Sequence, residues 1–406
     1  MALRLPRSAQ ERIHDLAELH LGRTFTAASL VVLRGGEPLF EHTWGWVRPG
    51  PPEVPATPAT RFDLASLTKL FTVTAFLGLV SQGQARLDQA LVDVVPEFGA
   101  ESPRPVDWWQ DPHTGQPLRC DAVAGGEPVD PASVTFRHLL THTSGLAPWR
   151  DVYTQAGPPP PPPGQPDSLT CRERYARGLA AICGYPFVDL PGRRVHYSDL
   201  GLILLGEAVC RLCPEGAAGL DQAIAGRVTG PLGLVSVVYN PLRQGLHPDS
   251  IAPTERDERW RGRRCWGEVH DENACGLGGV AGHAGLFATA RDVAAFGQAW
   301  LETDARLGIE PELARLATSE QASDGPTRRG LGWALKSEKD SPAGDVLSLS
   351  TFGHTGFTGT SLWVDPARAL VIALLTNRVY YGRDNEGIHR FRRTLHDCIA
   401  VEVRPC

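Results

Sequence analysis

The stretch Phe62-Asp-Leu-Ala-Ser-Leu-Thr-Lys69 carries the strongest structural and chemical signal in this chain of 406 residues. Ser66 and Lys69 lie three positions apart at the start of an apolar run. Within that run the hydrophobic residues recur at intervals of three and four, which predicts a helix over about 66–81 with one buried face. Gly83 is suited to end this helix.

A serine followed three residues later by a lysine suits nucleophilic catalysis. A serine hydroxyl is a poor nucleophile until a base takes its proton. Lys69 can be that base if burial or neighbouring positive charge destabilises its ammonium form. The helix N-terminus in turn favours the oxyanion that forms when Ser66 attacks a carbonyl. The same pair of residues could also be an ordinary helix cap and a solvated lysine.

A second motif, Val195-His-Tyr-Ser-Asp-Leu-Gly201, comes just before an apolar helix predicted over 201–212. A tyrosine at such a corner can meet the serine and the lysine across a domain junction. The phenol of Tyr197 could then relay a proton between the nucleophile and the leaving group. The alternative is that Ser198 or Asp199 caps the helix and Tyr197 packs in the core.

A third motif, Phe352-Gly-His-Thr-Gly-Phe-Thr-Gly359, precedes paired strands near the C-terminus. Glycines let a strand edge approach a ligand closely. His354 and Thr355 could bind polar groups of a substrate, and the backbone N–H of Phe357 could pair with that of Ser66 as an oxyanion hole. The alternative is a β-bulge or a turn.

Strand patterns are concentrated at the two ends of the chain. A hairpin is predicted around Gly35-Gly36, helices are predicted at 8–21 and 387–401, and the middle of the chain is mostly helical with long loops. Four further strand runs are found at 332–336, 350–354, 361–364 and 370–375. We therefore expect an α/β domain from residues 1–75 and 265–406, an inserted, mostly helical domain over 76–264, and an active site in the cleft between them.

The bulk composition argues against several classes of function. The net charge is −6 and the sequence has no long basic cluster, so it lacks the positively charged segment that binding to nucleic acid requires. The N-terminal residues lack the apolar core of an export signal, and nine cysteines without a regular framework suit reduced thiols. We expect a cytoplasmic protein with no membrane partner. The sequence gives no indication of the oligomeric state.

Taken together, the three motifs resemble those of the serine β-lactamase-like superfamily, in particular the group of class C β-lactamases, D,D-peptidases and family VIII esterases. Residues 136–146 and 278–292 are also similar to that group. The resemblance implies an α+β, β-lactamase/transpeptidase-like fold, with an antiparallel sheet flanked by the N- and C-terminal helices. It also implies that the reaction proceeds through an acyl-enzyme and requires no metal and no cofactor. The implied catalytic residues are Ser66, Lys69 and Tyr197, and the implied substrate-binding residues are Asp199, His354, Thr355, Gly356 and Phe357.

Two departures from the group bear on the substrate. Many members have lysine where His354 stands and asparagine where Asp199 stands, and both changes weaken attraction for an anionic β-lactam. We therefore rank a small ester or amide as substrate first, D,D-peptidase or class C-type β-lactamase activity second, and a catalytically silent binding protein of the same fold third.

Two other segments are left without an assigned role. His270, within 269–273, and His283 could line the cleft or could simply bind each other or water. The run Pro158–Pro163 is expected to be a stiff surface loop.

Overall fold

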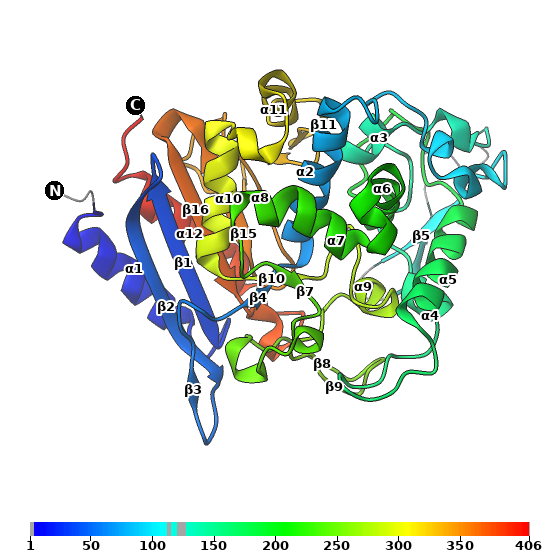
Figure 1. The fold of residues 1–406 in the computed structure, drawn as a ribbon. Helices are drawn as coiled ribbons and strands as arrows, with labels where there is room; N and C mark the ends of the chain where they lie inside the picture. Colours follow the sequence, from blue (N-terminus) through cyan, green and yellow to red (C-terminus); the bar gives the residue numbers. More distant parts are fainter. Residues whose placement is uncertain (1–3, 112–114, 120–126, 406) are drawn as a thin grey trace.

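The computed structural model describes residues 4–111, 115–119 and 127–405. Its centre is an antiparallel sheet of nine strands in the order β11-β12-β13-β14-β15-β16-β1-β2-β3 (Figure 1). Both ends of the chain supply its strands, as the sequence predicts. The strands are β1 (Ala27–Arg34), β2 (Glu37–Arg48), β3 (Val54–Pro55), β11 (Ala322–Asp324), β12 (Thr327–Arg329), β13 (Ala334–Leu335), β14 (Phe352–Thr355), β15 (Ser361–Asp365) and β16 (Leu370–Thr376).

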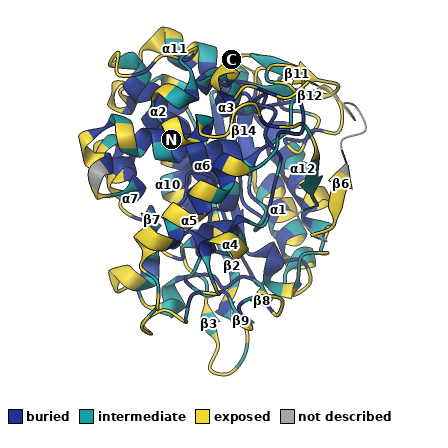
Figure 2. Cartoon of the chain, turned by 90° about the vertical axis from the view of Figure 1, so that its right-hand side faces the viewer, coloured by how far each residue is buried: buried dark blue, intermediate teal, exposed yellow. Residues whose placement is uncertain are grey.

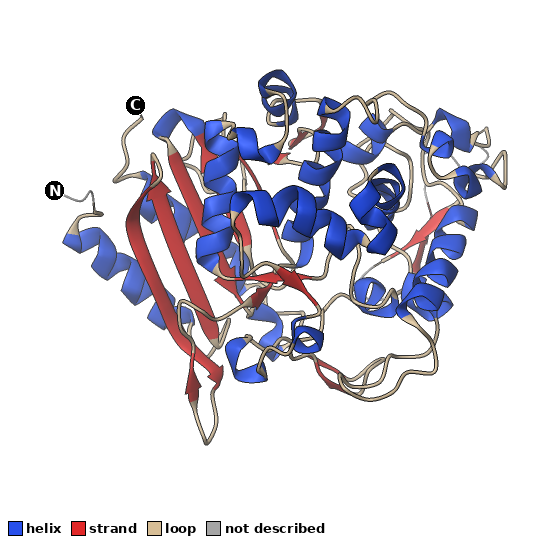
Figure 3. Ribbon diagram, viewed as in Figure 1, coloured by secondary structure: helices blue, strands red, loops and turns tan. Residues whose placement is uncertain are grey.

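Helices cover both faces of this sheet (Figures 1 and 3). Helices α1 (Arg7–His20) and α12 (Gly387–Ala400) pack together on one face, and α10 (Ala290–Glu302) lies on the other. Strand β16 is buried along its whole length, because alternate side chains enter the core on each face. This explains its uninterrupted apolar sequence and confirms an α+β fold with terminal helices flanking an antiparallel sheet.

The predicted hairpin joins β1 to β2. Gly35 and Gly36 have φ angles of 55° and 84°, the left-handed conformation that a tight two-residue hairpin turn requires. Residues with a side chain adopt this conformation only at a cost in free energy, so the two glycines fix the position of the turn between the first two strands.

The central helix α2 (Thr68–Ser81) differs from its prediction. The spacing of its apolar residues predicts one buried face, but every residue from Thr68 to Leu79 is buried. The reason is its position: α2 packs on α6 (Asp199–Leu212) on one side, and Phe71 stacks on Phe296 of α10 on the other. A helix enclosed in this way must be apolar all round, and its polar residues must find internal partners.

The remaining helices and strands are mostly short (Figure 1). Figure 2 shows exposed residues on the outer surface of several of these helices, while the interior of the molecule is buried. The helices are α3 (Phe136–Leu140), α4 (Val152–Ala156), α5 (Cys171–Gly184), α7 (Leu220–Ile224), α8 (Gly230–Leu232), α9 (Glu272–Gly276) and α11 (Pro311–Ala317). The strands are β4 (Phe62–Asp63), β5 (Trp108–Gln110), β6 (Pro117–Arg119), β7 (Val238–Tyr239), β8 (Arg256–Asp257), β9 (Arg263–Arg264) and β10 (Leu286–Ala288).

None of the helices in the described ranges combines the length and the apolar character needed to cross a bilayer. The division into two domains at residues 75 and 265 stays a prediction. Part of the middle of the chain, for which helices and long loops are expected, lies outside the described residues, at 112–114 and 120–126.

Candidate active site

Ser66 lies on a single 3-10 turn, Ala65–Leu67, between β4 and α2. Ala65 has a φ of 46°, an unfavourable angle for a residue with a side chain. The buried carboxylate of Asp63 holds this turn by accepting hydrogen bonds from the backbone N–H of Ala65 at 2.8 Å and of His270 at 2.6 Å. Strained backbone next to a nucleophile is a feature of functional sites. Asp63 is therefore a positioning residue that the sequence analysis missed.

The ammonium group of Lys69 is surrounded by oxygen acceptors. Its Nζ lies 2.8 Å from Ser66 Oγ, 2.8 Å from a carboxylate oxygen of Asp199 and 3.3 Å from the carbonyl oxygen of His283. These three acceptors match the three N–H donors of a protonated lysine, whereas a neutral amine has only two. The side chain is 1% exposed, so these contacts replace water.

The charge state of Lys69 differs from the sequence-based expectation. Burial by itself would lower the pKa of Lys69, but the carboxylate of Asp199 and the phenol of Tyr197 outweigh it and hold that pKa above its usual value. The condition for Lys69 to act as a neutral base, a destabilised ammonium, is therefore not met in the resting site. Asp199 is the physical reason, because it supplies a negative charge where an asparagine would supply none.

Tyr197 lies directly beside this pair. The centre of its ring is 4.8 Å from Lys69 Nζ, 5.1 Å from the guanidinium carbon of Arg329 and 5.6 Å from the ring centre of His354. Ser198 caps α6 by accepting from the N–H of Gly201, and this cap fixes the corner that carries Tyr197. The helix cap and a tyrosine that meets the serine–lysine pair are alternative interpretations of one motif. The structure contains the cap and also places Tyr197 beside Lys69.

The glycine-rich strand edge closes over the Ser66 turn. The hydroxyls of Thr358 and Thr360 donate to the carbonyl oxygens of Asp63 and Leu64 at 2.7 and 3.0 Å. A Cβ atom on Gly356 would lie 2.6 Å from the Leu64 oxygen, so the approach requires glycine. The two segments are thereby joined although nearly 300 residues separate them.

His354 is buried in this edge, and its Nδ1 lies 2.7 Å from the carbonyl oxygen of Thr355. Burial, together with the positive charges of Arg329 and Lys69, holds the pKa of His354 well below its usual range. His354 is therefore neutral near pH 7, and it offers hydrogen bonding rather than charge to a substrate.

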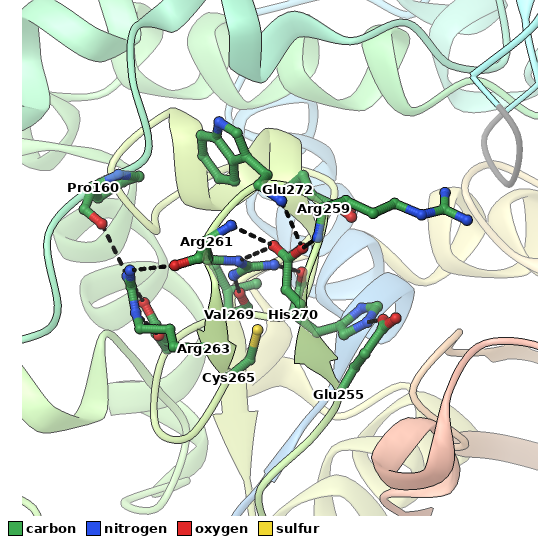
Figure 4. Close-up of polar contacts among 12 residues, drawn as sticks. Pro160, Glu255, Arg259, Arg261, Arg263, Cys265, Val269, His270 and Glu272 are labelled. Carbon is green, nitrogen blue, oxygen red and sulfur yellow. Dashed lines mark hydrogen bonds and ion pairs between the residues drawn. The ribbon is translucent and has the colours of Figure 1, made fainter.

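The segment 269–273 forms a further wall of the site (Figure 4). Buried Arg261 pairs with Asp257 at 2.7 Å and donates to the carbonyl oxygens of Val269 and His270. His270 Nε2 lies 2.6 Å from a carboxylate oxygen of Glu255. Figure 4 shows these contacts converging on the segment from β8 and the loops around it. This buried ion pair fixes the backbone that carries Asp271 into the site.

Asp271 and His283 form a hydrogen-bonded pair of 2.8 Å next to Lys69. Burial would raise the pKa of Asp271, but the His283 ring and the other donors around the carboxylate hold it below its usual value. The sequence left open whether the segment 269–273 and His283 line the cleft or bind each other or water. In the structure both line the cavity, and His283 binds Asp271 of that segment while His270 binds Glu255. Asp199, Asp271 and His283 lie close enough together to hold a metal ion, but the ammonium of Lys69 already lies 2.8 Å from the Asp199 carboxylate.

The residues of the three motifs meet at one cavity of about 560 Å³. Lys69 lies beneath its floor, and the other residues predicted from the three motifs line it. The lining includes Ser66, Tyr197, Asp199, His354, Thr355, Gly356 and Phe357, and also Arg329, which the sequence analysis did not single out.

Replacing Asp199 with asparagine is expected to lower the pKa of Lys69, because it removes the carboxylate that most favours the ammonium form. A raised pKa means that Lys69 keeps its proton below that pKa and loses it as the pH rises through it. The basic limb of the pH profile of kcat/KM should therefore move to lower pH in Asp199→Asn. Asp304→Asn, at a half-buried carboxylate that pairs with Arg306 and does not line the cavity, is the control. A basic limb that stays in place would contradict the assignment.

Comparisons with known proteins agree with this geometry. The profile of the Beta-lactamase family matches residues 15–396. The N-acetylmuramyl-L-alanine amidase of Bacillus subtilis (strain 168) is 32% identical over 390 residues, which cover 90% of this chain and 80% of that protein. A putative D-alanyl-D-alanine carboxypeptidase of Escherichia coli (strain K12) is 28% identical over 384 residues, which cover 87% of this chain and 79% of that protein.

Two solved structures show the same fold. EstCE1, described as a hydrolase with promiscuous acyltransferase activity, aligns with a TM-score of 0.69 at 19% identity over 97% of this chain and 99% of its own. A penicillin-binding protein homologue from Caulobacter crescentus aligns with a TM-score of 0.68 at 19% identity over 98% and 99% of the two chains. The family match over nearly the whole chain, the shared fold and the serine–lysine–tyrosine cluster lead to one conclusion: this protein belongs to the Beta-lactamase family and is a serine hydrolase.

Proposed function

We propose that this protein hydrolyses an amide bond of a small, cell-wall-type compound through an acyl-enzyme on Ser66. The observation that carries this proposal is the 2.8 Å contact between Ser66 Oγ and Lys69 Nζ beside Tyr197, at the floor of an open cavity. The amidase and carboxypeptidase relatives support an amide substrate. This puts a cell-wall-type amide, which the sequence analysis ranked second as a D,D-peptidase substrate, ahead of a small ester.

The proposed acylation step begins with a proton transfer. Lys69 is already an ammonium in the resting site, so it cannot accept the proton of Ser66 directly. Tyr197 acts as a phenolate, which the positive charges of Lys69 and Arg329 next to its ring stabilise. It takes the proton of Ser66 and becomes a neutral phenol. Ser66 then attacks the carbonyl carbon, and the backbone N–H groups of Ser66 and Phe357 receive the oxyanion.

The remaining steps return the proton and release the products. Tyr197 gives its proton to the nitrogen of the leaving group as the amide bond breaks. A water molecule then takes the place of the leaving group, Tyr197 accepts one of its protons, and the hydroxide attacks the acyl carbon. Ser66 regains a proton from Tyr197 when the acid product leaves.

Three substrates compare the alternatives directly: N-acetylmuramyl-L-alanine, a peptide ending in D-alanyl-D-alanine, and a chromogenic cephalosporin. We expect turnover of at least one of the two amides, with little or no turnover of the cephalosporin. Turnover of the cephalosporin alone would replace the proposal with a β-lactamase. Inert behaviour with all three and with a fluorophosphonate probe would favour a binding protein of the same fold.

Lys69→Ala is expected to lower kcat by about 10²-fold, the usual size of a general acid–base contribution. The variant removes the charge that stabilises Tyr197 during proton transfer and leaves Asp199 without its partner. Lys339→Ala, which removes the charge of an exposed lysine, is the control. A Lys69→Ala rate close to that of the wild type would refute the role given to Lys69.

A further inference from the structure

The peptide bond between Gly356 and Phe357 connects the proposed oxyanion hole to a buried arginine. Its N–H end is the donor that Phe357 contributes to the oxyanion in the proposed function. Its other end, the carbonyl oxygen of Gly356, accepts a hydrogen bond of 2.7 Å from Nη2 of Arg392. The peptide bond is trans, so its C=O and N–H groups point in opposite directions. Arg392 therefore holds this peptide from the side opposite to its N–H group.

Helix α12 places Arg392 for this contact. The residue is 4% exposed, and the same Nη2 atom donates to the carbonyl oxygen of Thr360 at 2.6 Å. That carbonyl oxygen also accepts from the N–H of Gly356 at 2.7 Å, so the loop between the two residues closes around the guanidinium. The next residue of the helix, Arg393, points outward and pairs with exposed Asp340.

No carboxylate balances the charge of Arg392. Among the described residues no acidic side chain forms an ion pair with it, and its Nε atom is buried without an acceptor. Burial and the positive charge of Arg378 lower the pKa of Arg392 to about 9, so the guanidinium is still charged near pH 7. A buried cation without a counter-charge is costly. Its positive potential acts on the backbone carbonyl groups that it contacts.

A second buried arginine, Arg378, holds the following peptide rather than this one. Its Nε atom donates to the carbonyl oxygen of Phe357 at 2.7 Å, and its Nη1 atom donates to the carbonyl oxygens of Arg383 and Asn385. Arg378 thus fixes Phe357 from its C-terminal side. Arg392 is the arginine that contacts the peptide unit carrying the proposed oxyanion donor.

We propose that Arg392 is a positioning residue of the oxyanion hole, which orients the Gly356–Phe357 peptide and strengthens its N–H group as a donor. This inference rests on the proposed function, in which the N–H groups of Ser66 and Phe357 receive the oxyanion. A cation at the carbonyl oxygen draws electron density through the amide, so the N–H at the other end becomes more positive. Hydrogen bonds that polarise one another in this way are stronger than isolated ones. The charge of Arg392 is thereby transmitted to the oxyanion through one peptide unit.

Pre-steady-state kinetics with p-nitrophenyl acetate test this role. Acylation and deacylation both pass through an oxyanion, so Arg392→Gln should slow each by about 10- to 100-fold, less than the loss of a whole donor. The dissociation constant of the ester before acylation should stay within about threefold, because the oxyanion is absent from the ground state. Arg392→Lys keeps the charge and should recover part of the lost rate. This second variant also carries the test if Arg392→Gln does not fold.

Nuclear magnetic resonance observes the peptide directly. Gly356-Phe357 is the single Gly-Phe pair in the sequence, so labelling glycine carbonyls with ¹³C and phenylalanine amides with ¹⁵N gives one correlated signal. In the wild type, phenylboronic acid, which forms a tetrahedral anion on a nucleophilic serine, should move the amide proton of this signal downfield. In both Arg392 variants the carbonyl carbon and the amide nitrogen should lie upfield of their wild-type positions, and the shift caused by phenylboronic acid should be smaller.

Two other arginines are matched controls. Arg104 is also buried and donates to the backbone carbonyl oxygens of Cys183 and Tyr185, but it does not line the cavity. Arg104→Gln therefore removes a similar structural contact far from the oxyanion peptide. Arg393→Gln removes the outward-pointing neighbour on α12. Both variants should acylate at the wild-type rate and keep the signal of the Gly356–Phe357 peptide in place.

The possible results separate this inference from the proposed function. If Arg392→Gln binds the ester more weakly but acylates at the normal rate, Arg392 is a substrate-binding residue and the inference is overturned. A peptide signal that is the same in the wild type and in both Arg392 variants would also overturn it. Ser66→Ala tests the proposed function by itself, because turnover that survives in this variant would contradict the acyl-enzyme whatever the role of Arg392.

Discussion

Ser66→Ala is expected to lower kcat by about 10⁴-fold or more, because no acyl-enzyme can form without the hydroxyl. Ser66 is the hydroxyl that Lys69 contacts at the cavity floor, and removal of a nucleophile from such a cluster typically costs this much. The rate with N-acetylmuramyl-L-alanine or with an activated ester gives the magnitude. Mass spectrometry after treatment with a fluorophosphonate identifies the labelled residue. The added mass should be on the peptide that contains Ser66.

Ser144→Ala is the matched control for the nucleophile. Ser144 is buried. Its hydroxyl accepts a hydrogen bond from the backbone N–H of Leu146 and does not line the cavity. This variant should keep its activity and its labelling. Turnover that survives in Ser66→Ala, or labelling that moves to another residue, would remove the basis of the proposed mechanism.

Tyr197→Phe is expected to lower kcat by about 10²- to 10⁴-fold, because the phenol hydroxyl carries the proton in both acylation and deacylation. The substitution keeps the aromatic ring, which packs against His142 at a centre-to-centre distance of 4.6 Å, so the corner before α6 should keep its shape. Single-turnover kinetics with an activated ester should show that formation and hydrolysis of the acyl-enzyme both slow down.

Tyr381→Phe removes a phenol hydroxyl from an exposed tyrosine and is the matched control. Its kinetics should equal those of the wild type. A Tyr197→Phe variant that acylates and deacylates at normal rates would show that another group moves the proton, and Asp271 with His283 would then be the next pair to test.

The sequence predicts the parts of this protein that depend on local order along the chain. The hairpin around Gly35 and Gly36 follows from a pair of glycines between two strand patterns, and the turn requires exactly the angles that glycine adopts freely. The fold class follows from where strand and helix patterns fall, and the terminal helices and the antiparallel sheet are as expected. The serine–lysine spacing likewise predicts that the two side chains meet. The 2.8 Å contact between Ser66 Oγ and Lys69 Nζ shows that they do, although Ser66 lies on the 3-10 turn before α2.

The electrostatics of the site could not be predicted in the same way. Whether Lys69 is a neutral base or an ammonium depends on Asp199, which lies 130 residues away in sequence and 2.8 Å away in space. The sequence showed that an acid stands where many relatives have an amide, but it did not show that this acid contacts the lysine. A pKa is set by the distance between charges and by burial, and neither is a local property of the chain.

What the sequence alone determined is the identity of the reacting groups and the elements that carry them, because periodicity and turn chemistry act between near neighbours. Only the tertiary structure decided the charge of those groups and the residues that surround them. The burial of α2 on all sides, the contact of the Asp63 carboxylate with the N–H of His270, and the position of Arg329 beside Tyr197 all arise from packing between segments far apart in the sequence. Interactions through space fix the chemistry of the site, and they exist only once the chain has folded.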